Sequence, residues 1–208
     1  MKHFTLPKEG GLIEKGIPAD ILHGFERIRT EIYDQSSTAS DKIADIIVNS
    51  INACQNRNFR LGLTTGSTPA SLYTRLKRAY DEGRVSFRNV EVYSIDEYYP
   101  YGKDEPQSRN MRLRSALLDG IDIPEENIHI PDGSVPQERI SEYCAEYDKA
   151  FRGLDLLVIG MGEQGQIGFN EAGTSLKSRT RTVLLSYHSR KRQGRFFNGD
   201  FKHTPAAA

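Results

Sequence analysis

Three short apolar runs, each followed by a polar or glycine-rich loop, constrain the fold of this chain more than any other feature. The runs cover residues 59–63, 89–95 and 154–159, and they carry the branched and aromatic side chains typical of strands. Segments with apolar residues at helical spacing lie between them. Strands that alternate with helices predict an α/β fold, a doubly wound and mainly parallel sheet with helices on both faces.

Capping residues predict where the helices begin. A Thr-Ala-Ser-Asp start is expected to open a helix over residues 38–54, and Thr68 is expected to cap a helix that has Pro69 as its first residue. A capping box at 134–137 is expected to open a helix that reaches about Phe151. The other predicted elements are helices at 108–118 and 189–197 and a short strand at 181–186.

Charge and composition exclude several classes of protein. The 208 residues contain 28 Lys and Arg against 28 Asp and Glu, so the chain is not a strongly basic nucleic-acid binder. Apolar runs fall short of the ~18 residues that span a bilayer, and no secretory signal is recognised at the N-terminus. We therefore expect one cytoplasmic domain over residues 1–208. Cys54 and Cys144 have no metal-site spacing and are expected to be buried thiols.

The loops that follow the predicted strands are the candidate binding sites, because ligands of open α/β sheets bind at the carboxyl ends of the strands. Residues 64–69 combine hydroxyl side chains, Gly66 and a helix N-terminus, which suits a phosphate. The alternative is a plain capped turn. Asp96 and Glu97 end the second strand. Since neighbouring side chains point to opposite faces, we expect at most one of the two to be catalytic and the other to be structural.

A glycine-rich loop after the third strand, with Gly160, Gly162 and Gly165, spells GxGxxG. The residues after it lack helical periodicity, and no acidic ribose partner follows at the required spacing, so a dinucleotide site is rejected and no cofactor or metal is predicted. Glu171 is either a second site carboxylate or a surface residue.

Residues 172–199 contain seven Lys and Arg and no Asp or Glu. Arginine binds phosphate through two parallel hydrogen bonds, so part of this basic segment is a candidate grip for a phosphorylated ligand. The alternative is a solvated basic surface. The basic residues are Lys177, Arg179, Arg181, Arg190, Lys191, Arg192 and Arg195.

Specific motifs also occur in one order along the chain. They are LGLTTGSTP at 61–69, VSF at 85–87, IDEY at 95–98, DIP at 122–124, GQIGFNE at 165–171, SRTR at 178–181 and RFFNGD at 195–200. Together they resemble the glucosamine-6-phosphate deaminase (isomerase) family, which is related to the 6-phosphogluconolactonases.

The resemblance implies a Rossmann-like fold and a hydrolase of amino sugar metabolism that converts glucosamine 6-phosphate to fructose 6-phosphate and ammonia. It implies that Asp96 is the base that moves a proton between C1 and C2, and that Glu171 belongs to the catalytic loop. It also implies a phosphate site made by Thr65, Gly66, Ser67, Thr68 and Arg195.

The chain departs from the family pattern at several positions. Gln164 and Gln166 stand where the family has the Asp and His that assist ring opening, and Arg109 stands where it often has a Tyr that contacts substrate. A glutamine amide cannot replace a titrating histidine. Residues that match the family's allosteric site are Thr174, Ser175 and Arg181, whereas Val183 replaces a Lys.

The leading expectation is therefore a sugar-phosphate deaminase/isomerase with an altered catalytic loop, truncated at its C-terminal end relative to the family. The alternatives are a non-catalytic sugar-phosphate binding or regulatory homologue and an enzyme with a changed substrate, such as a lactonase-like hydrolase. The expected partner is a small-molecule sugar phosphate, with no nucleic acid or membrane, and a homo-oligomer is left open.

Overall fold

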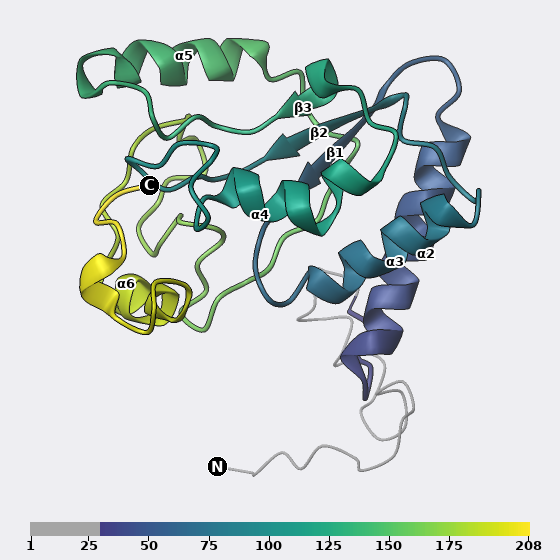
Figure 1. Ribbon diagram of the computed structural model, residues 1–208, viewed down its shortest axis with the longest axis horizontal. Coiled ribbons are helices and arrows are strands. Elements are labelled where there is room, and N and C mark those ends of the chain that lie inside the picture. The colour runs from purple at the N-terminus through teal and green to yellow at the C-terminus, as the bar shows by residue number, and fades with distance from the viewer. Residues whose placement is uncertain (1–29) are drawn as a thin grey trace, which may run out of the picture.

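The computed structural model describes residues 30–208, and its centre is a four-stranded sheet in the order β3-β2-β1-β4 (Figure 1). All three strand pairings are parallel. The strands are β1 (Phe59–Leu63), β2 (Val90–Ser94), β3 (Ile128–His129) and β4 (Leu156–Leu157). The prediction of an α/β fold with a mainly parallel sheet is confirmed. The N-terminus, where no secretory signal was recognised, lies outside the described residues.

Both faces of the central strands are covered. Leu61 and Val92 are fully buried in the main core together with apolar residues of helices α2 (Ser36–Ala53), α3 (Ala70–Asp81) and α4 (Arg109–Ala116). Tyr93 follows Val92 and therefore points to the other face. There its ring stacks on His129 and meets the edge of Phe151, the residue that ends helix α5 (Ile140–Ala150).

Helix α6 (Tyr187–Gln193) contributes no residue to the sheet's main core. It lies at the end of the molecule toward which the arrowheads of β2 and β3 point (Figure 1). Five short 3₁₀ helices complete the described part of the chain: η1 (Leu118–Gly120), η2 (Glu125–Asn127), η3 (Gln137–Arg139), η4 (Gly194–Phe196) and η5 (Phe201–His203).

Three predicted helix starts are wrong, because the expected capping side chains are used elsewhere or not at all. Helix α2 begins at Ser36, and Ser40 from the expected cap instead hydrogen bonds to Ser71. Helix α3 begins at Ala70, after Pro69, and no side chain caps it. Helix α5 begins at Ile140 behind η3, while the Ser134 hydroxyl donates to Asp132.

Two strand predictions also need correction. Strand β4 keeps only two residues of the predicted run, and its apolar side chains are not covered on both faces, since Leu157 and Ile159 are 41% and 42% exposed. Residues 181–186 form no strand of the sheet. Instead, the backbones of Val183 and Leu185 pair antiparallel with residues 206–208.

Cys54 and Cys144 are both free thiols, and each is half-buried rather than buried.

Candidate active site

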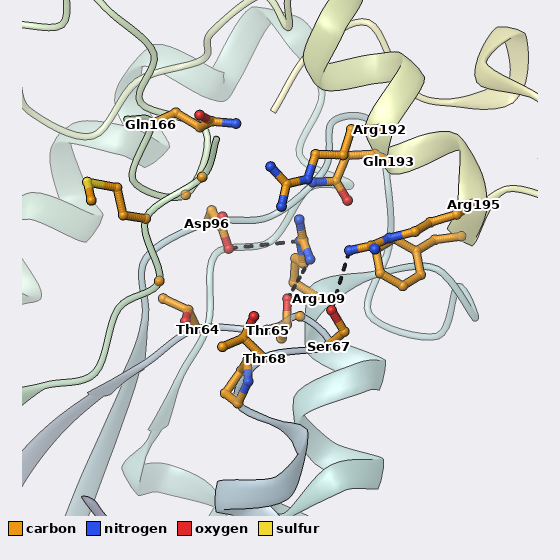
Figure 2. A pocket seen from close by; sticks show the side chains of 17 residues that line it. Thr64, Thr65, Ser67, Thr68, Asp96, Arg109, Gln166, Arg192, Gln193 and Arg195 are labelled. Atoms are coloured by element: carbon orange, nitrogen blue, oxygen red, sulfur yellow. Dashed lines mark hydrogen bonds and ion pairs between the residues drawn. The ribbon is translucent and has the colours of Figure 1, made fainter. Parts of the chain in front are cut away.

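The strand order reverses between β1 and β4, because β2 and β3 lie on one side of β1 and β4 on the other. Ligands of such sheets bind at the carboxyl ends of the strands at this switch point. A pocket of about 120 Å³ lies there, between the loops after β1, β2 and β4 and the α6–η4 segment. It is lined by residues 64–69, Asp96, Arg109, 160–162, Gln166, Gly168, Arg192, Gln193, Arg195 and Phe196 (Figure 2).

The loop after β1 and Arg195 meet in this pocket, as the sequence predicted. Thr65, Gly66, Ser67 and Thr68 all line it, and the Arg195 guanidinium lies 3.5 Å from the Ser67 hydroxyl. These residues are more than 120 positions apart in the chain, so the pocket depends on how η4 is placed against the sheet. Hydroxyl groups beside an arginine make a site suited to an anion.

Asp96 and Glu97 have the separate positions that strand alternation predicts. The Glu97 carboxylate accepts three backbone N–H groups, from Tyr98 at 2.7 Å, Arg109 at 2.8 Å and Asn110 at 2.9 Å. It therefore holds the beginning of α4, where helix N–H groups lack partners. Burial raises the pKa of Glu97, and these hydrogen bonds oppose the shift.

The Asp96 side chain lines the pocket and is 9% exposed. Burial raises its pKa above the usual value of an aspartate, while the positive charge of Arg109 acts in the opposite direction. A carboxylate with a raised pKa, at the wall of a pocket, has the properties of a general base.

Arg109, which the family resemblance put at a substrate-contacting position, also lines the pocket. Its Nη1 donates to the Thr65 hydroxyl at 2.8 Å, and its Nε lies 4.0 Å from Asp96 Oδ1. The guanidinium also lies over the rings of Tyr98 and Phe169, 4.9 Å from each centroid. It is thus placed between the hydroxyl-rich loop after β1 and the Asp96 carboxylate (Figure 2).

The glycine-rich loop after β4 turns back on itself and covers one side of the pocket. The N–H of Gly162 donates to the carbonyl of Gln166 at 2.8 Å, and Gln166 Oε1 accepts the N–H of Gln164 at 3.0 Å. Gln166 lines the pocket with Asp96, whereas Gln164 does not. Gly168, at φ +58°, lets the loop approach closely, since a Cβ there would lie 2.9 Å from Asp96 Oδ2.

Glu171 does not line the pocket with Asp96. Its carboxylate accepts the Ser189 hydroxyl at 2.5 Å and the Ser186 N–H at 3.2 Å, so it ties the loop to the beginning of α6. Burial raises the pKa of Glu171. The hydrogen bonds from Ser189 and Ser186 and the charge of His188 together lower this pKa by a larger amount, so the net shift is downward.

Of the basic segment, only Arg192 and Arg195 line the pocket. Arg192 also lies 3.6 Å from Glu163. The sequence identified Arg192 only as one of the seven basic residues of this segment. Arg190 has a structural role, because it donates to the carbonyl of Thr204 at 3.1 Å.

The residues that match the family's allosteric site lie together but outside the pocket. Arg181 donates to Thr174 at 3.5 Å and to Asn170 at 3.2 Å. The hydroxyl of nearby Ser175 accepts the N–H of Lys177. Val183 is partly buried against the small core around Tyr98.

Within residues 30–208, no three His, Cys, Asp or Glu side chains are grouped in a way that suits a metal ion. Over the same residues, no helix combines the length and the apolar character needed to cross a membrane.

Comparisons with known proteins agree with this geometry. The family described as glucosamine-6-phosphate isomerases/6-phosphogluconolactonase matches residues 34–195. A glucosamine-6-phosphate isomerase of Candida albicans is 38% identical over 184 residues, which cover 87% of this chain and 73% of the relative. The chain spans only part of the length of the curated relatives that it matches. The matched part is 30% to 73% of the relative's own length in four of them.

Solved structures support the same fold. A monomeric glucosamine-6-phosphate deaminase superposes with a TM-score of 0.81 at 28% identity, covering 86% of this chain and 74% of that one. The 6-phosphogluconolactonase of Thermotoga maritima has a TM-score of 0.56 at 18% identity over 74% of this chain and 68% of that one, a likeness of fold alone.

Fold and site together define an α/β protein with a pocket of hydroxyl groups and arginines at the switch point of a parallel sheet. The chain belongs to the glucosamine-6-phosphate isomerase/6-phosphogluconolactonase family.

Proposed function

We propose that the chain acts as a glucosamine-6-phosphate deaminase/isomerase, with Asp96 as the base. The observation that carries this proposal is the presence, in one pocket, of a buried carboxylate with a raised pKa and a hydroxyl loop beside Arg195. The first can move a proton, and the second suits the phosphate that anchors the sugar. The substrate in this proposal, glucosamine 6-phosphate, is taken from the names of the relatives.

The reaction begins from the open-chain sugar, which has an aldehyde at C1 and an amine at C2. Asp96 removes the proton from C2. The electron pair of that bond forms a C1=C2 double bond, and the carbonyl pair moves onto O1. The carboxyl then returns the proton to C1 while the nitrogen forms a C2=N bond and gives a proton to O1. Water adds at C2, ammonia leaves, and fructose 6-phosphate remains.

Ring opening is the step for which the chain lacks the family's relay. Gln166 lines the pocket, but its amide does not titrate near neutral pH, and Glu171 is bonded to Ser186 and Ser189. We infer that the glycine-rich loop does not catalyse ring opening and that the chain uses sugar that opens spontaneously. Loss of a general acid or base typically lowers the rate by about 10²–10⁴.

A panel of substrates tests the proposal. We expect the chain to release ammonia from millimolar glucosamine 6-phosphate and not to hydrolyse 6-phosphogluconolactone. Arg195→Gln should weaken substrate binding by about tenfold or more, because a charge-assisted hydrogen bond is worth about 1.5–3 kcal/mol. Arg88→Gln is the matched control, because Arg88 pairs with Asp122 outside the pocket.

The other outcomes identify the alternatives. Binding of glucosamine 6-phosphate without ammonia release would contradict the proposal in favour of a binding protein. Hydrolysis of the lactone without release of ammonia would contradict it in favour of a lactonase.

A further inference from the structure

Two guanidinium groups lie over the ring of Phe196, a residue that lines the pocket. The central guanidinium carbon of Arg112 is 4.0 Å from the ring centroid, and that of Arg195 is 4.7 Å from it. The two positive charges are therefore no more than about 9 Å apart, close to the Debye length of about 8 Å at physiological salt. Arg195 donates to Ser67 in the loop after β1, whereas Arg112 does not line the pocket.

The positive charge of Arg112 is not balanced by a nearby carboxylate. Arg109 has Asp96 at 4.0 Å, but within residues 30–208 no carboxylate lies at ion-pair distance from the half-buried Arg112 side chain. Burial lowers the pKa of Arg112, and the positive charges of Arg109 and Arg195 lower it further. Arg112 also lies in the first turn of α4, where the helix dipole disfavours a positive charge. Its charge therefore does not stabilise the free protein.

We propose that Arg112 is a positioning residue of the phosphate site, which restrains the Phe196 ring beside Arg195 and adds positive charge that a bound phosphate balances. The inference rests on the proposed function, which puts the phosphate beside Ser67 and Arg195, and deepens it. A cation over an aromatic face is attracted to the ring, so Arg112 limits the movement of the ring on which Arg195 lies. A bound dianion offsets the repulsion between the two guanidinium groups.

This role concerns binding rather than the chemical step. The phosphate keeps its charge throughout the reaction, so an interaction with it is equally strong in the ground state and the transition state. Loss of such an interaction raises KM and should leave kcat within about twofold. Arg112 is therefore expected to affect the binding of inorganic phosphate as well as that of a sugar phosphate, and salt should screen the effect.

Calorimetry with inorganic phosphate compares Arg112→Met, which keeps the apolar part of the side chain and removes the charge, with a control on the same helix, Arg114→Met. Arg114 pairs with Glu125 away from the pocket. We expect Arg112→Met to raise the Kd for phosphate about fivefold at an ionic strength of about 0.01 M, and less than about twofold at about 1 M. Arg114→Met should leave the Kd unchanged and lower the Tm by about 2–4 °C. The Tm of Arg112→Met should fall less than that of the control.

Two further variants separate charge, packing and the contact with the ring. Arg112→Lys keeps a cation and should recover most of the affinity for phosphate, so an equal loss in Arg112→Lys and Arg112→Met would overturn the inference. When Arg112→Met is combined with Phe196→Leu, its effect on the Kd should be smaller than in the native background, because the ring that connects it to Arg195 is gone. The same effect in both backgrounds would contradict a role that acts through Phe196.

Phosphate binding also separates failure of this inference from failure of the proposed function. If the native chain binds phosphate but releases no ammonia from glucosamine 6-phosphate, the proposed function fails, and the Kd values still decide the role of Arg112. An unchanged Kd in Arg112→Met would overturn the inference, and so would a native chain that does not bind millimolar phosphate. If Arg112→Met does not fold, Arg112→Gln decides by the same comparison.

Discussion

Asp96 and Glu97 are adjacent acids with different roles, and the backbone separates them. Their side chains leave the end of β2 in opposite directions, so Asp96 reaches the pocket while Glu97 reaches the first turn of α4. The same pair of residues thus supplies a candidate base and the anchor that positions Arg109.

Glu97→Ala should lower the free energy of unfolding by roughly 3 kcal/mol or more, because it leaves three backbone N–H groups without their acceptor. Glu97→Gln keeps one acceptor oxygen and should cost less. Urea unfolding measures both. An equal and small loss for the two variants would contradict the structural role of this carboxylate.

The pH dependence of kcat/KM should show the raised pKa of Asp96. The base acts only when deprotonated, so the rate should rise with pH through a value above 3.8, the ordinary value for this group. The pKa is obtained from the acid side of the kcat/KM profile, after correction for ionisation of the substrate. A rate that stays constant down to pH 4 would show that Asp96 is not the base.

At the scale of elements, the close approach of the glycine-rich loop to β2 depends on Gly168. Gly168→Ala adds a Cβ only 2.9 Å from Asp96 Oδ2 at φ +58°, whereas Gly173→Ala adds one at φ +91° with no atom within 4 Å. In both variants the free energy of unfolding should fall by about 1–2 kcal/mol, because an alanine is strained at a positive φ.

Only Gly168→Ala should also lower kcat, by tenfold or more, since it displaces the carboxylate. Steady-state assays beside thermal melts separate the two effects. Equal kcat values for the two alanine variants would contradict the importance of this contact.

The elements also show what the sequence can predict. The apolar runs of β1 and β2 placed both strands to within a residue, because burial on a sheet leaves a strong local pattern. The strand-end rule then predicted that Asp96 and residues 64–69 share one pocket. Helix starts were less predictable, since the capping bond expected of Ser134 goes to Asp132 instead.

Arg109 could be recognised in the sequence only as an unusual residue at a substrate position. It reaches the pocket because Glu97 holds the start of α4, and no local pattern encodes that contact. Glu171 is a different case. Its motif suggested a second site carboxylate, and in the structure this carboxylate accepts hydrogen bonds from Ser186 and Ser189 at the start of α6. Its catalytic role stays a prediction.

At the scale of the whole molecule, the pocket joins segments that are distant in the chain. The loop after β1 and the α6–η4 segment both line it, and the hydrogen bond from Arg195 to Ser67 that connects them is long at 3.5 Å. A phosphate bound to both walls would connect the C-terminal segment to the sheet.

Sugar phosphate should therefore stabilise the whole fold. At a concentration of 100 Kd the expected gain is about 2.7 kcal/mol, and the Tm should rise with ligand concentration. Hydrogen exchange should slow both in residues 64–69 and in α6. In Arg195→Gln the same ligand concentration should have a much smaller effect. Protection confined to one of the two segments would contradict binding across the pocket.

The most direct test of the account follows fructose 6-phosphate and ammonia together, from glucosamine 6-phosphate incubated with the native chain and with Asp96→Asn. The account predicts equal amounts of both products from the native chain. It predicts a rate at least 10² lower for Asp96→Asn, with phosphate binding retained. Formation of both products at the same rate by the two proteins would contradict the role of Asp96 as the proton-transfer base.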